Sequence, residues 1–420
     1  TGLVARDQLI GPGQVPVSNF SITKTDINSQ HGQVLTLGEK PNIAPLDAKC
    51  SIEMASGEVI TNISSVYIKD MKAIKLSANW MANSSCDNEL LNLYTSVKRL
   101  SYLCRKLDIV IPVGKDSLSM STKWNDKKQN EVKSPISLVL SAFASINDIE
   151  KYVTPRTEKN SSLFLIDLGN NANRMGGSAL DQTCNIVNNK PPRISNISSL
   201  NNYFNCTQEL LKNNLLNAYH DRSDGGLITT LIEMGFASNM SIKLKKQNLT
   251  SIDIYKFLFN EELGGVFSVS SNNKNKFMNF LKKHKLISSC RELGSIKKEE
   301  NPSIEIIDAN YIESLSNLRK YWSELSYLIQ SKRDNKKTAS EEYQEKINYH
   351  KNIHKQIEPK ATYSFKDKIK KSLIHKSKPK IAIFREQGIN GHREMSNAFN
   401  LAGFDSYDIN TNDIINNPDI

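Results

Sequence analysis

The sequence predicts a mixed α/β (α+β) protein built from layers of strands and helices. Short apolar runs that are typical of buried strands, such as residues 136–144, recur along the chain. Between them, apolar residues recur at steps of three and four, the spacing of a helix with one buried face. The chain has 420 residues, of which 38% are hydrophobic and 24% are charged, so it can bury the cores of two or three domains.

Composition argues against several classes of protein. The longest apolar runs are far too short to span a bilayer, and the first residues show no basic leader followed by an apolar run. We therefore expect neither a membrane protein nor an export signal. The six cysteines are scattered without a CxxC pair, which argues against a zinc site and against a disulfide framework. A reducing cytoplasm is the expected location.

The net charge of +11 would suit a nucleic-acid partner, but its distribution does not. Lysine is abundant along the whole chain together with asparagine and isoleucine, and the densest basic stretch, Lys332–Lys380, resembles a linker. Nucleic-acid-binding proteins usually concentrate charge on one face with interleaved aromatic residues. We therefore expect no nucleic acid among the partners.

Residues 1–148 are expected to form the first unit, in which short strands accompany two helices. One helix is predicted over residues 48–63, and a second begins after Asp87, its predicted N-cap. The second helix carries one apolar stripe at alternating steps of three and four residues: Leu90, Leu93, Val97, Leu100, Cys104 and Leu107. Residues 135–143 then read as a buried strand that closes this unit.

Residues 155–315 are expected to form the second unit. Strands are predicted over residues 162–169 and 264–270, and helices over residues 227–236 and 274–284. Strands and helices alternate here without a strict strand–helix–strand rhythm, which favours mixed layering over a purely parallel sheet.

The remaining chain divides into a connector and a short third unit. Residues 316–378 begin as a packed helix and then turn polar and lysine-rich, which is typical of a linker. Residues 379–420 begin with the strand Lys380–Phe384, a glycine turn and a helix that starts near Arg393. This order opens many doubly wound α/β domains, but one such unit is too short to close a sheet.

Glu58 and Asn62 are the first candidates for a functional site. In a helix over residues 48–63 they stack on one face, four residues apart, at the edge of the buried stripe. A carboxylate and an amide oxygen in that position can present hard oxygen ligands to a magnesium ion that carries phosphates. A solvated pair on the surface is the alternative, and the spacing alone favours it.

The segment His220–Gly226 packs two aspartates, a serine and a glycine pair into a short turn before an apolar helix. Its glycines permit close backbone approach to phosphate, Asp221 or Asp224 can hold a metal, and Ser223 can donate to a phosphate oxygen. A polar turn in which Asp224 caps the following helix is an equally good interpretation.

Two further segments are weaker candidates for phosphate binding. The Gly114-Lys115 step is not a Walker A loop, because Ile109 stands where the first glycine would be. Lys115 could reach a phosphate as a point charge, and a solvated turn lysine is as good an interpretation. The Gly11-Pro-Gly13 segment is better explained as a simple turn.

Seven segments of the chain, in this order, resemble successive stretches of the large, single-chain phosphoribosylformylglycinamidine synthases. They are residues 1–8, 11–17, 74–81, 111–120, 220–226, 259–264 and 385–390. The resemblance covers essentially the whole chain, and several of the segments are long and specific. We therefore expect an internal fragment of such a synthase, with the first synthetase duplicate lying upstream.

The resemblance implies both a fold and a reaction. Residues 1–148 and 155–315 would be the paired α/β domains of the second aminoimidazole ribonucleotide synthetase-like duplicate, and residues from 379 the start of a class I glutaminase. The family converts formylglycinamide ribonucleotide, ATP and glutamine to formylglycinamidine ribonucleotide, ADP, phosphate and glutamate. ATP activates the amide oxygen, ammonia from glutamine displaces phosphate, and magnesium screens the phosphoryl charge.

The resemblance also implies a set of binding residues. Ser18 and Ser223 would contact the nucleotide, and the magnesium ligands would be Asn19, Glu58, Asn62 and Asp221. Asn19 departs from the family, which usually has aspartate there, so one negative ligand is lost and magnesium binding should weaken. In the family the nucleotide of the second duplicate is largely structural, so these residues would stabilise rather than catalyse.

Two hypotheses follow for the chain as a whole. In the first, it is part of a working ATP-dependent ligase whose partners are the remaining synthase domains. In the second, it is a non-catalytic nucleotide-binding scaffold left from a degraded or split synthase. No cysteine lies beyond Cys290, so the glutaminase nucleophile is absent and this chain alone is not expected to hydrolyse glutamine. A third hypothesis, another ATP-using member of the superfamily such as selenophosphate synthetase or thiamin monophosphate kinase, fails because the chain continues into a glutaminase start.

Overall fold

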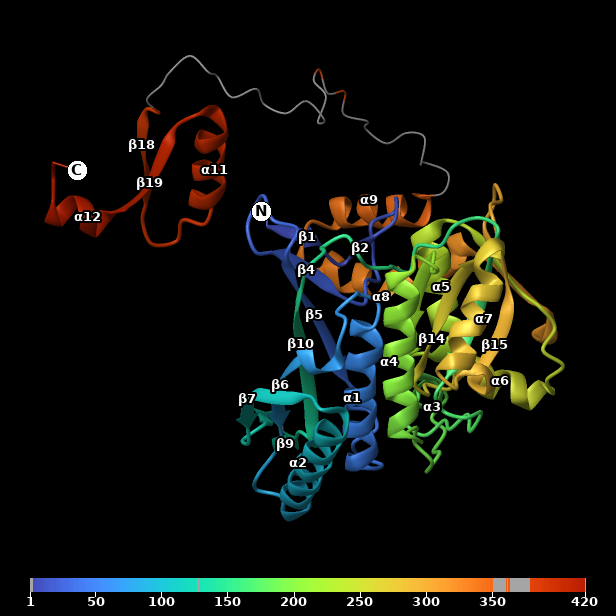
Figure 1. Cartoon of the computed structure of the whole chain (residues 1–420). Coiled ribbons are helices and arrows are strands. Elements are labelled where there is room, and N and C mark those ends of the chain that lie inside the picture. The colour runs from blue at the N-terminus through green and yellow to red at the C-terminus, as the bar shows by residue number, and fades with distance from the viewer. Residues whose placement is uncertain (1–2, 127, 350–359, 361, 363–377, 420) are drawn as a thin grey trace.

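The computed structural model describes residues 3–126, 128–349, 360, 362 and 378–419, and its two largest parts are each built around one sheet (Figure 1). The first sheet has six strands in the order β1-β4-β5-β10-β6-β7. Their bounds are Val4–Arg6, Ser21–Lys24, Gly32–Glu39, Ser137–Ile146, Lys75–Met81 and Val110–Ser117. All neighbours are antiparallel except β6 and β7. A hairpin of β8 (Ser121–Asn125) and β9 (Gln129–Lys133) stands apart from this sheet.

The helix α1 (Ala48–Ile63) lies between this sheet and a helix of the second part, α4 (Ile197–Lys212) (Figure 1). It begins where the Asp47 side chain accepts a hydrogen bond from the Cys50 amide, 3.0 Å away. The predicted bounds of 48–63 are confirmed. The buried surface is wider than the predicted stripe, because the helix is covered from both sides.

The second helix, α2 (Asp87–Leu107), is confirmed, but two details of its prediction are wrong. Its N-cap is Cys86, and Asp87 lies in the first turn, where a carboxylate still interacts favourably with the helix dipole. The predicted stripe is buried only toward its carboxyl end. Leu90 and Val97 are 43% and 45% exposed, because the described neighbours cover the second half of the helix.

The second sheet has seven strands in the order β12-β14-β11-β15-β13-β16-β17. Their bounds are Ala218–Asp221, Gly264–Ser270, Ser161–Asp167, Cys290–Lys297, Ser241–Leu244, Ser303–Ile306 and Tyr311–Ser314. The pairing is antiparallel except between β13 and β16, so mixed layering is confirmed. The helices of this part besides α4 are α3 (Ala179–Cys184), α5 (Gly226–Ser238), α6 (Ser251–Phe259) and α7 (Lys274–Lys283).

Both faces of the second sheet are buried, each in a different core. In β11, Phe164 and Ile166 point into a core that they share with α4, α7 and the whole first sheet. Leu163 and Leu165 alternate to the other face, where α5 and α6 pack. The first core is therefore continuous from one sheet to the other, which fixes the two parts against each other.

A short N-terminal hairpin leaves the first part and enters the core of the second. Its strands are β2 (Leu9–Ile10) and β3 (Val15–Pro16). Ile10, Val15 and Val17 are buried among the apolar residues of α5 and α6. A side chain at Gly11 would collide with the Ala237 carbonyl in α5, so the turn fits only as glycine. The turn predicted at residues 11–13 is confirmed, and it also packs against α5, which was not predicted.

After the second sheet, α8 (Leu315–Arg333) and α9 (Lys336–Ile347) form a helical hairpin. The lysine-rich connector was expected to begin near Lys332, but α9 is a helix, capped by Asn335. It is ordered because Tyr343 stacks on Tyr327 of α8, with ring centroids 4.4 Å apart. The rest of the predicted connector, up to residue 377, lies almost wholly outside the described residues.

The C-terminal unit consists of β18 (Lys380–Arg385), α11 (His392–Ala402), β19 (Asp405–Asn410) and α12 (Thr411–Asn416). The two strands pair in parallel with a helix between them, as predicted for the opening of a doubly wound domain. Across the described ranges, none of the helices is long and apolar enough to cross a membrane.

The buried ion pair between Asp167 and Arg222 generates a stability prediction. Asp167 also accepts amide hydrogen bonds from Gly169 and Asn171, and although burial alone would raise its pKa, Arg222 and these bonds lower it. We expect Asp167→Asn to reduce the free energy of unfolding by about 3–5 kcal/mol at pH 7, because a guanidinium is left buried without its partner. Urea denaturation measures this loss.

The pH dependence and a surface control sharpen this test. Because the folded pKa of Asp167 is lowered, the stabilisation is present above the ordinary carboxyl pKa of about 4 and is lost as the pH falls further. The variant and the wild type should therefore converge in acid. Glu305→Gln removes the partner of the exposed Lys243 and should cost about 0–1 kcal/mol. An equally small cost for Asp167→Asn would contradict the prediction.

Candidate functional site

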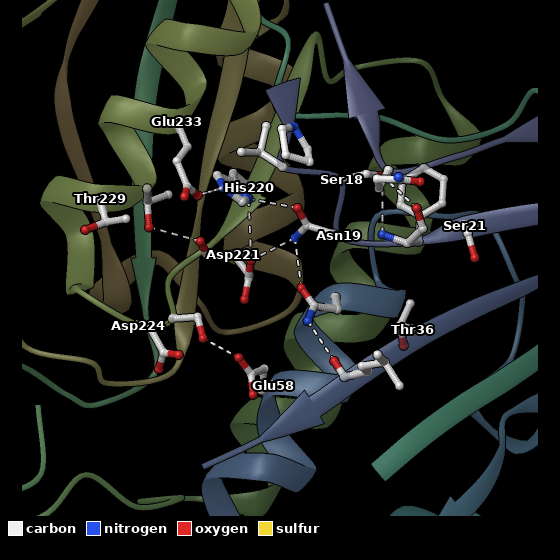
Figure 2. Close-up of a pocket in the computed structure, with 18 of the residues that line it drawn as sticks. Ser18, Asn19, Ser21, Thr36, Glu58, His220, Asp221, Asp224, Thr229 and Glu233 are labelled. Atoms are coloured by element: carbon white, nitrogen blue, oxygen red, sulfur yellow. Dashed lines mark hydrogen bonds and ion pairs between the residues drawn. The ribbon is translucent and has the colours of Figure 1, made fainter. Parts of the chain in front are cut away.

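A cavity with a volume of about 510 Å3 lies where the two parts meet (Figure 2). The loop after β3, strand β5 and helix α1 line it from the first part, and the end of β12, the following turn and α5 line it from the second. All six residues singled out from the sequence line this cavity: Ser18, Asn19, Glu58, Asn62, Asp221 and Ser223. Segments far apart in the chain are brought together here by the shared core.

Ser18 and Asn19 follow the buried hairpin β2–β3, which carries their loop across to the second part. The Ser18 hydroxyl donates to the Phe20 carbonyl at 2.6 Å, and the Ser18 amide donates to the Gln8 carbonyl at 3.3 Å. Asn19 is 8% exposed. The loop is therefore anchored on both sides, with Asn19 directed into the cavity (Figure 2).

Glu58 and Asn62 project from α1 at the edge of its buried surface, as predicted. One Glu58 oxygen accepts the Glu39 amide at 2.8 Å, and the other accepts the Ser223 hydroxyl. The Asn62 amide group donates to the Leu37 carbonyl at 3.0 Å. The pKa of Glu58 is raised to about 7, chiefly by burial and in smaller part by the nearby Asp221, against the opposing effect of a lysine. Glu58 thus lies in a poorly hydrated position, where a nearby cation would stabilise its charged form.

The turn after β12 presents Asp221 and Ser223, and its shape depends on a glycine pair. Gly225 and Gly226 have φ angles of 79° and 74°, and a side chain at Gly226 would lie 2.7 Å from the Asn260 carbonyl oxygen. The N-cap of α5 is Gly225, so the capping interpretation of Asp224 is wrong.

The segment 259–264 holds this turn in place from behind. The buried Glu261 carboxylate accepts the amides of Gly225 and Ala179 at 2.9 and 2.8 Å. The backbone carbonyl of Glu262 accepts the Arg222 guanidinium at 2.6 Å. This segment therefore supports the site without lining the cavity.

Asn19 joins the two parts of the site with three hydrogen bonds. Its amide nitrogen donates to Asn62 Oδ1 at 3.0 Å and to Asp221 Oδ1 at 2.9 Å, and its oxygen faces His220 Nδ1 at 2.8 Å (Figure 2). The partners determine which end of the amide faces which way. The Asn62 nitrogen is used on Leu37, and a carboxylate only accepts, so both oxygens require a donor from Asn19.

His220 extends this network through Glu233 to Trp322, which does not line the cavity. Its Nε2 lies 2.8 Å from Glu233 Oε2, and the other Glu233 oxygen accepts the Trp322 indole at 3.1 Å. Burial alone would lower the pKa of His220, but the carboxylates of Asp221 and Glu233 raise it to about 9. A charged imidazole donates from both nitrogens, which is what Asn19 and Glu233 require.

Lys40 is a site residue that the sequence reasoning missed. It is 1% exposed, and its ammonium donates to the Ser223 hydroxyl at 2.9 Å and to Asp224, while lying 3.8 Å from Glu58. Burial alone would lower its pKa, but Glu58, Asp224 and Glu261 raise it, so the amine stays charged. A signal was present: Val34, Thr36 and Gly38 are buried at every second position of β5, and Lys40 continues that alternation.

The weaker candidates do not reach this cavity. Lys115 lies on β7, where it is exposed and donates to Ser117. Gly11 and Gly13 belong to the packed hairpin. Neither segment lines the cavity, so the interpretation of Lys115 as a phosphate contact is not supported by its position.

The chemistry of the cavity suits a phosphorylated ligand. It combines serine hydroxyls, a buried ammonium at its edge and the oxygens of Glu58, Asn62 and Asp221. In the part of the chain described, no group of three or more His, Cys, Asp and Glu side chains is placed to hold a metal ion. The Asn19 oxygen faces His220.

Three family models match the chain in order. Residues 1–145 match the FGAR-AT PurM_N-like domain, residues 166–307 the C-terminal domain of AIR synthase related proteins, and residues 378–419 the CobB/CobQ-like glutamine amidotransferase domain. This is an FGAM synthase-like protein. The predicted family and fold class are confirmed: two PurM-like domains precede the start of a glutamine amidotransferase domain.

Solved structures agree with the fold of this FGAM synthase-like chain. PurL of Thermotoga maritima in complex with FGAR matches with a TM-score of 0.52 and 9% identity, over 76% of this chain and 49% of PurL. The complex with ATP matches with a TM-score of 0.50 and 9% identity, over 71% and 47%. The complex with ADP matches with a TM-score of 0.50 and 10% identity, over 74% and 47%. The chain thus spans about half the length of these structures.

The buried Lys40 generates a prediction for this site. We expect Lys40→Met to reduce the free energy of unfolding by about 3 kcal/mol, because Glu58 keeps its buried position but loses the cation that faces it. Chemical denaturation at neutral pH measures the loss. Lys49→Met is the control, since Lys49 is exposed on the adjoining α1 and should change stability by about 0.5 kcal/mol or less. Equal stabilities for the two variants would argue against a buried, charged Lys40.

Proposed function

We propose that this chain is the second synthetase duplicate, with the start of the glutaminase, of an enzyme that makes formylglycinamidine ribonucleotide. In that reaction formylglycinamide ribonucleotide, ATP and glutamine yield formylglycinamidine ribonucleotide, glutamate, ADP and phosphate. One observation supports this proposal most strongly. Six residues from three separate segments of the sequence line one cavity between the two matched synthetase domains. Its partners would be the remaining synthase domains and glutamine or ammonia.

Within this proposal, the cavity binds ATP or ADP. Ser18 and Ser223 donate to phosphate oxygens, and each hydroxyl is now engaged with a neighbouring acceptor that a phosphate would replace. Lys40 holds Ser223 and Glu58 in position and supplies a positive charge close to the phosphates. These side chains come from both parts, so a bound nucleotide would also tie the parts together.

Magnesium would be held by the oxygens of Glu58, Asn62 and Asp221, with Asn19 as the fourth predicted ligand. When bound, the ion screens the negative charge of the phosphates. Asn62 and Asp221 direct oxygens to one point in the cavity, which Glu58 also lines, and this fits a hard cation. Asn19 does not fit as it stands, because its nitrogen rather than its oxygen faces Asn62 and Asp221.

A non-catalytic nucleotide-binding scaffold is the second candidate function. Asn19 favours it, because a neutral amide in this network leaves fewer negative ligands for the metal that phosphoryl transfer requires. The same six residues would then bind a nucleotide that stabilises the fold. Both candidates require nucleotide binding, so the first test addresses that step.

The purified chain should bind ADP in the presence of magnesium chloride, as measured by isothermal titration calorimetry. We expect Glu58→Gln to weaken this binding about tenfold, equivalent to about 1.4 kcal/mol, because it removes a negative ligand and leaves the shape nearly unchanged. Glu39→Gln is the matched control: Glu39 lies next to this carboxylate but its side chain is exposed.

Two results would count against the proposal. If the wild-type chain binds neither ADP nor ATP, the cavity is not a nucleotide site. If Glu58→Gln and Glu39→Gln bind Mg-ADP with the same affinity as the wild type, nucleotide binding stands but Glu58 is no metal ligand.

A further inference from the structure

The Asn19 amide lies at the point on which the oxygens of the site converge. Its nitrogen is 3.0 Å from Asn62 Oδ1 and 2.9 Å from Asp221 Oδ1, one from each part of the protein. An amide group carries two N–H donors, and both are used here. Oxygens that approach one point from different elements are also how proteins bind a divalent cation, and two such oxygens would supply part of its ligand set.

We propose that Asn19 is a specificity-determining residue: its amide nitrogen takes the position of a divalent cation between Asn62 and Asp221 and so lowers the affinity of the cavity for such cations. This inference rests on the proposed function, in which these oxygens are the metal ligands. It differs from the sequence-based expectation, in which Asn19 is itself a ligand.

The orientation of the amide is determined by its neighbours and not by Asn19 alone. If the amide were reversed, its oxygen would face two oxygens, and its N–H groups would face His220 Nδ1. Asn62 cannot adapt without breaking its hydrogen bond to the Leu37 carbonyl. A cation would therefore have to displace Asn19 and disturb at least two hydrogen bonds before it reaches the oxygens.

The position of Asn19 is also supported by a chain of contacts that begins in the lining of the cavity and continues beyond it. His220 is 7% exposed and is held by Glu233, which in turn accepts the Trp322 indole from α8. Arg319 lies over the Trp322 ring, 4.6 Å from its centroid, and fixes that side chain. Asn19 thus belongs to a connected set of side chains that runs from the buried His220 to the exposed Trp322, and is not a freely rotating amide.

Without the Asn19 side chain, the electrostatics favour a cation. The Asp221 carboxylate would keep His220 at 3.4 Å but lose its closer donor, and Glu58 lies in the same cavity. Two carboxylates in a poorly hydrated space repel one another unless a positive charge lies between them. Removing a residue that is predicted to be a ligand should therefore strengthen cation binding.

The test measures binding of Mn2+ alone to the full 420-residue chain by calorimetry. We expect Asn19→Ala to bind Mn2+ about tenfold more tightly than the wild type, because the cation no longer has to displace the Asn19 amide. A tenfold change in affinity corresponds to about 1.4 kcal/mol of binding free energy. Ser21→Ala is the control: Ser21 lines the same cavity and lies outside the network, so it should leave Mn2+ affinity unchanged. Equal or weaker Mn2+ binding by Asn19→Ala would overturn the inference.

A second variant covers the case in which Asn19→Ala fails to fold. Asn19→Asp keeps the size of the side chain and an acceptor for His220, but replaces both donors by oxygen, so it should also bind Mn2+ at least about tenfold more tightly. A folded Asn19→Asp chain without tighter Mn2+ binding would overturn the inference.

The ADP titration in magnesium chloride described above, set beside the Mn2+ titration, separates this inference from the proposed function. If Asn19→Ala binds Mn2+ more tightly but neither it nor the wild type binds ADP, the role of Asn19 stands and the cavity is not a nucleotide site. If the wild type binds ADP but Asn19→Ala has unchanged Mn2+ affinity, the nucleotide site stands and the role of Asn19 is wrong.

Discussion

The rest of the structure depends on the burial of α1 between the two sheets. The helix packs on β5 and β10 with one side and on α4 with the other, and its apolar residues join one core that runs through both parts. Apolar burial is not directional, but close packing on two sides leaves a helix little freedom to slide or rotate. The positions of Glu58 and Asn62 relative to the turn at Asp221 follow from this packing.

Around that fixed helix, the site is held by polar groups that would be costly to leave unpaired. The buried charges of Lys40, Glu58, His220 and Asp221 each lie within reach of an opposite charge or a hydrogen-bond partner. Removing one partner exposes the others to the full cost of desolvation. A ligand that enters the cavity must therefore replace these interactions, and phosphate oxygens and a cation are chemically suited to do so.

Sequence patterns within a short stretch of chain predicted the helices and strands whose bounds depend on that stretch alone. The bounds of α1 and β14 follow from apolar periodicity and flanking turn residues, and the six cavity residues follow from motifs together with a family resemblance. The predicted N-cap of α2 was wrong because either of two adjacent residues could begin the helix. Which one does so depends on the path of the chain that precedes it. The helix α9 was missed because its order comes from the aromatic stack of Tyr343 on Tyr327, a contact between helices.

Two of the residues that support the site could not be predicted either, because they too depend on contacts between elements distant in the sequence. Glu233 and Trp322 carry no motif, and they matter only because α5 and α8 bring them together behind His220. Lys40 could have been found, since the alternation of β5 places it on the buried face. The orientation of the Asn19 amide could not have been predicted from the sequence, because it depends on hydrogen bonds with three partners from distant segments.

The hairpin β2–β3 has a consequence for how the protein is made. Residues near the start of the chain are inserted in a core that is assembled from residues translated much later, and the hydrogen bond from Asn19 to Asp221 joins positions 202 apart. On the ribosome, the N-terminal segment must wait with its apolar side chains uncovered until the second sheet has emerged. Contacts of such long sequence separation fold slowly and expose the nascent chain to aggregation. The cavity is therefore among the last features to form during synthesis, and its ligand can bind only after both parts have docked.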